Sequence, residues 1–263
     1  MAPELWQVLA VTLLGLAAAG SVMALAGRPG PWAAVALGGR LGSLAVLSLA
    51  LWAAAAQEGG WAPLDLRQMA LAVALAAAAA HLAHSRLPGT AGGSPAVDLL
   101  VAALVIVEMA VVRPGAPALT CAQRALPYHA EWGLFFLGSG ATLVSGGAGL
   151  FLALGSRITS RLPDTGASQR NLLGHAAFLS TLALGGGIVA GVWWTWRTTG
   201  TLVAGDIRES WMAVTWLLAA MSLVAWQLER QASRWAAVLA IAAAAAALFG
   251  LLALPDLQRL MGT

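Results

Sequence analysis

The chain contains 263 residues, of which 60% are hydrophobic and only 10% are charged, and its mean hydropathy is +0.80. Soluble domains carry roughly 25% charged residues, so this composition excludes an ordinary soluble domain and indicates a protein that crosses a membrane several times. The net charge of +3 is spread over short connections, which leaves no basic patch for a nucleic acid. Cys121 is the single cysteine, which excludes an intramolecular disulfide, a CxxC redox pair and a cysteine-based zinc site.

Eight apolar segments follow one another along the chain. Each is near the roughly 20 residues that a helix needs to cross about 30 Å of hydrocarbon. Residues rich in Gly, Pro and charge separate each segment from the next. We therefore predict an all-α fold, a polytopic membrane bundle of about eight transmembrane helices with both termini on one side. The predicted segments are 5–27, 33–56, 66–84, 96–112, 132–155, 171–196, 210–228 and 234–254.

The distribution of arginine predicts the orientation of this bundle. All the basic residues are arginines, and more of them fall on the side of the first connection than on the side of the termini. Connections rich in basic residues stay in the cytoplasm. We therefore place both termini, the 113–131 connection and residues 187–218 outside.

Four histidines are candidate ligands for a haem iron. His81 and His84 are three residues apart at the inner end of the third segment, so they share one face of a helix. His175 lies about one turn into the sixth segment from the same side, and His129 lies outside, just before the fifth segment. Two imidazoles at one depth on facing helices could bind one haem axially. A single intramembrane histidine more often bonds to a neighbouring helix, and both interpretations stay open for His81 and His175.

Small residues recur in the fifth and sixth segments, in "GSGATLVSGGAGLFLALGS" and "LALGGGIVAG". Small side chains at four-residue spacing let two helix backbones approach closely. We predict tight packing of these two helices, and room for a flat ligand beside them is the alternative.

The connection between the sixth and seventh segments is rich in tryptophan and charge. Tryptophans at a membrane boundary are ordinary interface anchors. However, "DIRESWMAVTW" at 206–216 resembles, in order and spacing, the "D-P-K-E-T-W-x-x-x-T-W" that ends the WWD region of the cytochrome c assembly family. This family contains CcsA, CcmC, CcmF and the HemX-type haem-handling membrane proteins. The similarity extends more loosely over residues 126–230, where "LPYHAEW" resembles the segment in which an external histidine opens a span.

The resemblance implies haem handling at the outer face of a bacterial plasma membrane. In the family, the WWD loop is an aromatic platform, and external histidines hold the iron while haem is presented to apocytochrome c. The chain departs from this pattern in "RTTGTLVAG" at 197–205, where the family has further tryptophans, and in a final segment without histidine. The residues that match the family's site, or flank it, are His129, Trp193, Trp194, Trp196, Asp206, Glu209, Trp211 and Trp216.

Two functions remain open at this point. The first is a membrane component of cytochrome c biogenesis or tetrapyrrole metabolism that binds b-type haem non-covalently, with His81, His129 and His175 as iron candidates and another membrane protein as partner. The second is a structural or regulatory subunit that keeps the fold and binds no haem. A small-molecule carrier is disfavoured, because the predicted membrane interior lacks paired ionisable groups.

The chain is expected to be one integral membrane domain, 1–263, and not an enzyme on its own. Within it we distinguish four variable spans in 1–112, a family-like core in 126–254 and a WWD-like loop at 193–216.

Overall fold

The computed structural model describes residues 3–26, 30–57, 66–87, 94–110, 126–154, 163–202, 207–228 and 234–252. In these ranges the chain is helical and contains no strand, so the predicted all-α fold is confirmed. The helices are α1 (Pro3–Leu25), α2 (Pro31–Gln57), α3 (Leu66–His84), α4 (Pro95–Ala110), α5 (Leu126–Leu154), α7 (Pro163–Thr199), α8 (Ile207–Leu228) and α9 (Arg234–Leu252).

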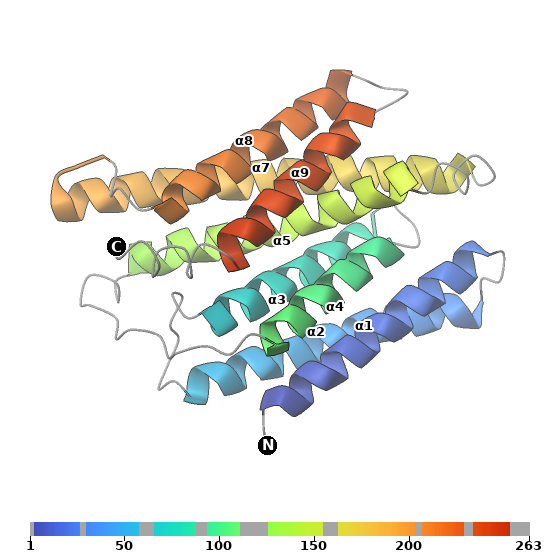
Figure 1. The fold of residues 1–263 in the computed structure, drawn as a ribbon. Helices are drawn as coiled ribbons and strands as arrows, with labels where there is room; N and C mark the ends of the chain where they lie inside the picture. The colour runs from blue at the N-terminus through green and yellow to red at the C-terminus, as the bar shows by residue number, and fades with distance from the viewer. Residues whose placement is uncertain are drawn as a thin grey trace.

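Six of these helices are long and apolar enough to cross a membrane by length and composition, namely α1, α2, α5, α7, α8 and α9. Of the other two, α4 has only 16 residues, and α3 has 19, like α9, but carries polar side chains at its ends, such as Arg67 and His84. Figure 1 shows α3 and α4 between the α1–α2 pair and α5, and the helices on both sides contact them. The chain is therefore a multi-pass membrane bundle in which α3 and α4 lie between the α1–α2 pair and α5.

The helices alternate in direction, so α1 begins and α9 ends at the same end of the bundle (Figure 1). We call this the outer end and the opposite end the inner end, following the orientation predicted from the arginines. The α3–α4 connection and the beginning of α7 lie at the inner end, whereas the beginning of α5 and the end of α7 lie at the outer end. Helix α5 is central, because it contacts α3, α4, α7 and α9.

Exposed tryptophans mark both boundaries of the membrane on α2. Trp32 is 36% exposed at the beginning of this helix, and Trp52 is 71% exposed near its end. Twenty residues of helix separate them, which is about 30 Å and matches the thickness of the hydrocarbon core. Tryptophan prefers the two membrane interfaces, so this spacing supports a spanning position for α2.

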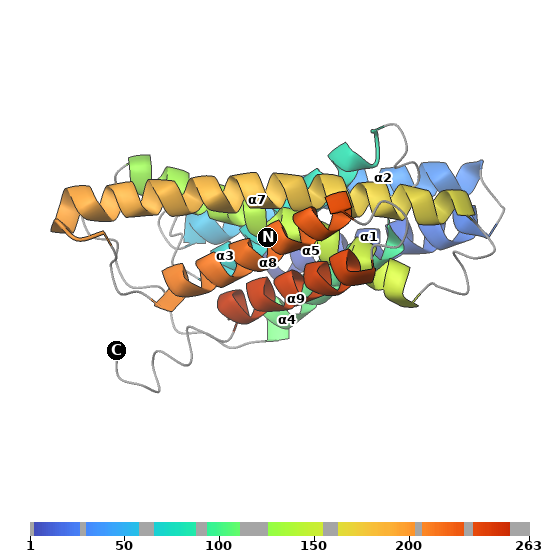
Figure 2. The same ribbon diagram turned by 90° about the horizontal axis from the view of Figure 1, so that it is seen from above.

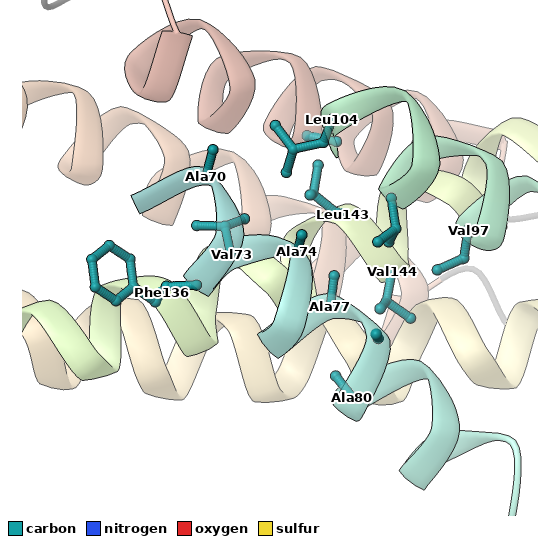
Figure 3. Packing of buried hydrophobic residues seen from close by; sticks show 14 of the residues in the cluster. Ala70, Val73, Ala74, Ala77, Ala80, Val97, Leu104, Phe136, Leu143 and Val144 are labelled. Carbon is teal, nitrogen blue, oxygen red and sulfur yellow. The ribbon is translucent and has the colours of Figure 1, made fainter. Parts of the chain in front are cut away.

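Small side chains form the seam at which α3 packs against α4 and α5. Figure 3 shows Ala74 and Ala77 of α3 beside Leu143 and Val144 of α5, and these four side chains are buried. Lipid is as apolar as the core, so close packing between helix surfaces, more than the hydrophobic effect, has to hold such a seam together. The approach is closest at Gly140, where an added Cβ would lie 2.6 Å from the backbone nitrogen of Ala77.

The predicted tight packing of α5 on α7 is also present. A Cβ added at Gly138 of α5 would lie 2.6 Å from Cγ of Leu184 on α7. Helix α7 runs across the whole molecule in Figure 2, and its 37 residues measure about 55 Å. It therefore extends beyond the hydrocarbon core, and its polar ends explain why the apolar segment 171–196 predicted a shorter helix.

Most of the region 193–216, which resembles the family's WWD loop, is helical. Helix α7 continues to Thr199, and α8 begins at Ile207, so the tryptophans before and after the connection are helical. Gly200 ends α7: its φ is +75°, and its N–H donates to the Trp196 carbonyl over 3.0 Å. A glycine with positive φ is a common helix terminator because it has no Cβ to strain.

Candidate functional site

Two histidines from different helices meet at the inner end of the bundle. His84 is the last residue of α3, and His175 lies on α7. Their ring centres are 6.3 Å apart, and the ring planes make an angle of 32°. The His84 Nδ1–H donates to the Ala80 carbonyl over 2.6 Å. A carbonyl can only accept, so this bond fixes the tautomer and leaves the imidazole lone pair on Nε2.

His175 is held in place by aromatic packing. Its ring centre lies 6.4 Å from that of Trp226 on α8. The adjacent Gly174 makes room for this indole, because a Cβ there would overlap the Trp226 ring. The Nδ1 atom of His175 is buried and has no hydrogen-bond partner among the described residues. Since buried polar atoms are normally paired, this atom is a candidate for binding something further.

The spacing of the two rings suits a shared metal atom. Two imidazoles that bind one metal from opposite sides have ring centres about 6 Å apart, since each metal–nitrogen bond is about 2 Å long. Among the described residues, no group of three His, Cys, Asp or Glu side chains is arranged to hold a metal ion. A pair of imidazoles without a third side-chain ligand is what haem iron takes axially, and it does not complete a tetrahedral zinc site.

His81 lies differently from His84. Its Nδ1 is 2.9 Å from Oδ1 of Asp98 on α4, and its Nε2 accepts the backbone N–H of Ser94 over 2.8 Å. Both ring nitrogens are thus engaged, and the residue is 1% exposed. As an iron ligand, His81 would first have to give up one of these bonds. Residues three apart on a helix differ by about 60° in direction, which turns His81 towards α4 and His84 towards α7.

The expectation that the membrane interior lacks paired ionisable groups is wrong. Arg40 of α2 forms a buried ion pair with Asp98, with Nη2 and Oδ2 2.9 Å apart, and its Nη2 also donates to Ser21 of α1. Together with His81 this cluster joins the first four helices. A single charge inside each apolar run, "LGGRLGS" and "PAVDLLV", was the sequence signal for it.

A second polar cluster lies towards the other end of α4. Glu108 accepts a hydrogen bond from Gln7 of α1 and lies 3.5 Å from Nε of Arg67 on α3. Buried Val101, Leu104 and Val105 separate Glu108 from Asp98 along the helix. The two clusters therefore tie α4 to its neighbours at two levels, with apolar packing between them.

Some tryptophans of the predicted aromatic platform are exposed at the end of α7, and others are packed between helices. Trp193 and Trp196 are about half exposed near the end of α7, and the Arg197 guanidinium lies 5.7 Å from the Trp193 ring centre. Trp194 is partly buried against the core. Trp211 instead packs on Phe249 of α9, with ring centres 4.8 Å apart.

Trp216 also serves helix packing. Its Nε1–H donates to the Thr181 carbonyl on α7 over 3.1 Å. His129 lies near the beginning of α5, and its buried Nδ1 has no partner within the described part of the chain. Its ring meets that of Tyr128 edge-on, with ring centres 5.9 Å apart. Asp206 and the side chain of Glu209 lie outside the described part of the chain. The outer residues of the family motif are thus near one end of the bundle, with two of their tryptophans used between helices.

Comparison with known proteins places this arrangement in a known fold. No protein-family model and no curated protein sequence matches the chain. Among solved structures, cytochrome c heme lyase CcmF is similar, with a TM-score of 0.64 and 20% sequence identity over 95% of this chain and 46% of the CcmF chain. The chain thus spans about half the length of that protein. The structure supports the resemblance seen in the sequence: the described helices have the fold of part of the cytochrome c heme lyase CcmF.

Proposed function

We propose that the chain is a multi-pass component of cytochrome c biogenesis in a bacterial plasma membrane, and that it binds b-type haem between α3 and α7. The observation that carries this proposal is the His84–His175 pair, with ring centres 6.3 Å apart. The CcmF-like fold supports it, because that neighbour is a cytochrome c heme lyase by name. His84 and His175 are the proposed axial ligands, in place of the His81–His175 pair.

The residues around the pair have distinct tasks in this proposal. The Ala80 carbonyl orients the His84 ring through Nδ1, and the Trp226 indole holds the His175 ring from the side. Haem bound there would be held by His84 and His175 and would supply a redox-active iron. The unpartnered Nδ1 of His175 and the absence of a third ligand among the described residues fit this group.

The outer end is proposed to face a partner membrane protein. His129 and the exposed Trp193 and Trp196 lie at this end, but the sequence after 252 contains no histidine that could complete an external pair. We infer that the partner supplies the second external ligand and the apocytochrome thiols. Asp206 and the side chain of Glu209 lie outside the described part of the chain, and we propose that both belong to this outer surface.

We expect the protein purified in detergent to show a Soret band. The haem content of His175→Ala should be lower by roughly tenfold or more, because losing even a residue that only supports a metal ligand costs about 10–100-fold in affinity. Pyridine haemochrome analysis per mole of protein is the measurement. His129→Ala is the matched control, because it removes the same side chain at the outer end of the bundle, where this chain purified without its partner has only one external ligand, and it should leave the haem content unchanged. Haem-free wild-type protein after reconstitution, or equal haem in His175→Ala, would contradict the proposal.

The alternative is a structural or regulatory subunit that keeps this fold without haem. The packing of Trp211 on Phe249 and the hydrogen bond from Trp216 favour it, because both side chains stabilise helix contacts instead of offering a platform. In this case Trp216→Phe should lower thermal stability, while no spectroscopic change follows from any histidine replacement.

A further inference from the structure

Two arginines lie next to the histidine pair at the inner end of the bundle, one on each side of it. Arg86 follows His84 by two residues, and Arg170 precedes His175 by five residues on α7. The Arg86 side chain is exposed, and that of Arg170 is half-buried. Neither guanidinium has a hydrogen bond or an ion pair among the described residues. Both are therefore available to an anion that enters the site from outside the chain.

The backbone places each arginine closer to the inner membrane boundary than its histidine. The Leu87 N–H donates to the His84 carbonyl over 3.0 Å, so the chain turns tightly where α3 ends. Two residues of chain reach at most about 7 Å, which keeps Arg86 beside His84. On α7, five residues of helix measure about 7.5 Å, and Arg170 lies closer to the inner end than His175 by this length.

Arg170 also lies on a suitable face of α7. It is four residues from Gly174, so the two residues share one helix face. The Trp226 ring packs against Gly174, and its centre is 6.4 Å from that of His175. Arg170 is therefore one helical turn from the indole that borders the histidine pair, whereas Arg86 borders the pair from the end of α3.

The nearby buried acid does not neutralise these two arginines. The Asp98 carboxylate is already engaged by Arg40 and by His81, each at 2.9 Å. Arg86 and Arg170 thus leave a local excess of positive charge beside the pair. An anion with its charge at this boundary and its apolar part between the helices matches that distribution.

We propose that Arg86 and Arg170 bind the propionate carboxylates of a b-type haem that His84 and His175 hold, an inference that rests on the proposed function. Haem carries both carboxylates along one edge of an otherwise apolar ring. Burying a charge in hydrocarbon is costly, so this edge has to face the nearest membrane boundary, which for this pair is the inner one. Arginine binds carboxylates through strong, often bidentate hydrogen bonds. The two arginines are therefore positioning residues that determine which edge of the ring faces inwards.

The test compares haem with its dimethyl ester, in which both carboxylates are uncharged. The full-length chain, purified from haem-depleted cells, is titrated with each ligand at the Soret band. We expect the wild-type chain to bind haem more tightly than the ester. The double variant Arg86→Gln with Arg170→Gln should weaken haem by roughly fivefold for each arginine removed, the upper end of what an exposed ion pair contributes. Its affinity for the ester and the low-spin spectrum of its bound haem should not change, because the iron ligands remain.

Two further variants separate charge from structure. Arg86→Lys with Arg170→Lys keeps both charges and should lose less haem affinity than the glutamine variant. Arg197→Gln, on an exposed residue near the opposite end of α7, is the matched control and should bind both ligands like the wild type.

The outcomes distinguish this inference from the haem proposal on which it rests. A wild-type chain that binds neither ligand would contradict the histidine pair itself. A wild-type chain that binds haem and ester equally would refute the arginines alone, as would unchanged haem affinity in the glutamine variant. Equal weakening of both ligands in that variant would also refute it, because the arginines would then support the fold and not the carboxylates.

Discussion

Replacing Arg40 by methionine is expected to lower the free energy of unfolding by about 3–5 kcal/mol, because the change leaves the buried Asp98 carboxylate without its cation. The side chains of this pair are 6% and 2% exposed, so water cannot replace the guanidinium. Asp98 also accepts from His81, and Arg40 donates to Ser21, so the loss spreads to α1 and α3. The measurement is the circular-dichroism unfolding midpoint of detergent-solubilised protein in a denaturant titration.

A double replacement distinguishes the cost of the unpaired charge from the cost of the lost side-chain packing. Arg40→Met with Asp98→Asn removes both charges, keeps an oxygen for His81, and should recover more than half of the loss, because the cost comes mainly from one unpaired buried charge. Arg234→Met, at the exposed first residue of α9, is the matched control and should stay within about 0.5 kcal/mol of wild type. Equal, small effects of Arg40→Met and Arg234→Met would show that the pair does not stabilise the fold.

The positions of the helices were predictable because the membrane sets the length of an apolar segment. All eight predicted segments correspond to helices, and the differences lie at polar ends such as the first turns of α5 and α7. Those turns continue beyond the hydrocarbon core, where helix formation depends on local sequence and hydropathy gives no signal. The same limit applies to the end of α7, which continues to Thr199, three residues beyond the predicted segment 171–196.

The membrane depth of the candidate histidines could be predicted from the sequence, but the helices that their side chains face could not. The sequence predicts that His175, His81 and His84 lie at a similar depth in the membrane. Hydropathy does not show which face of α3 contacts which neighbouring helix. The choice between the two depends on Asp98, which engages His81 and leaves His84 as the ring beside His175. Arg40 and Asp98 are 58 residues apart in the sequence, so only the structure shows that they form a pair between α2 and α4.

Gly140→Val is expected to destabilise the protein by about 3 kcal/mol or more, because a side chain there has to enter the backbone of α3. An added Cβ would lie 2.6 Å from the Ala77 nitrogen and 2.8 Å from the Ala76 carbonyl carbon, and backbone cannot rotate away as a side chain can. Figure 3 shows the small residues of α3 on this seam, which positions the helix that ends in His84. Pushing α3 away from α5 should therefore also separate His84 from His175.

The two consequences can be measured on one sample, as the unfolding midpoint and the haem content of purified Gly140→Val. Gly133→Val is the matched control on the same helix, since a Cβ at Gly133 meets nothing within 4 Å. Valine is a slightly better helix former than glycine, so the control should equal or exceed wild type in stability and keep its haem. If Gly140→Val loses stability but keeps full haem content, the seam supports the fold without positioning the histidine pair. If it loses neither, the close approach of α3 and α5 is itself refuted.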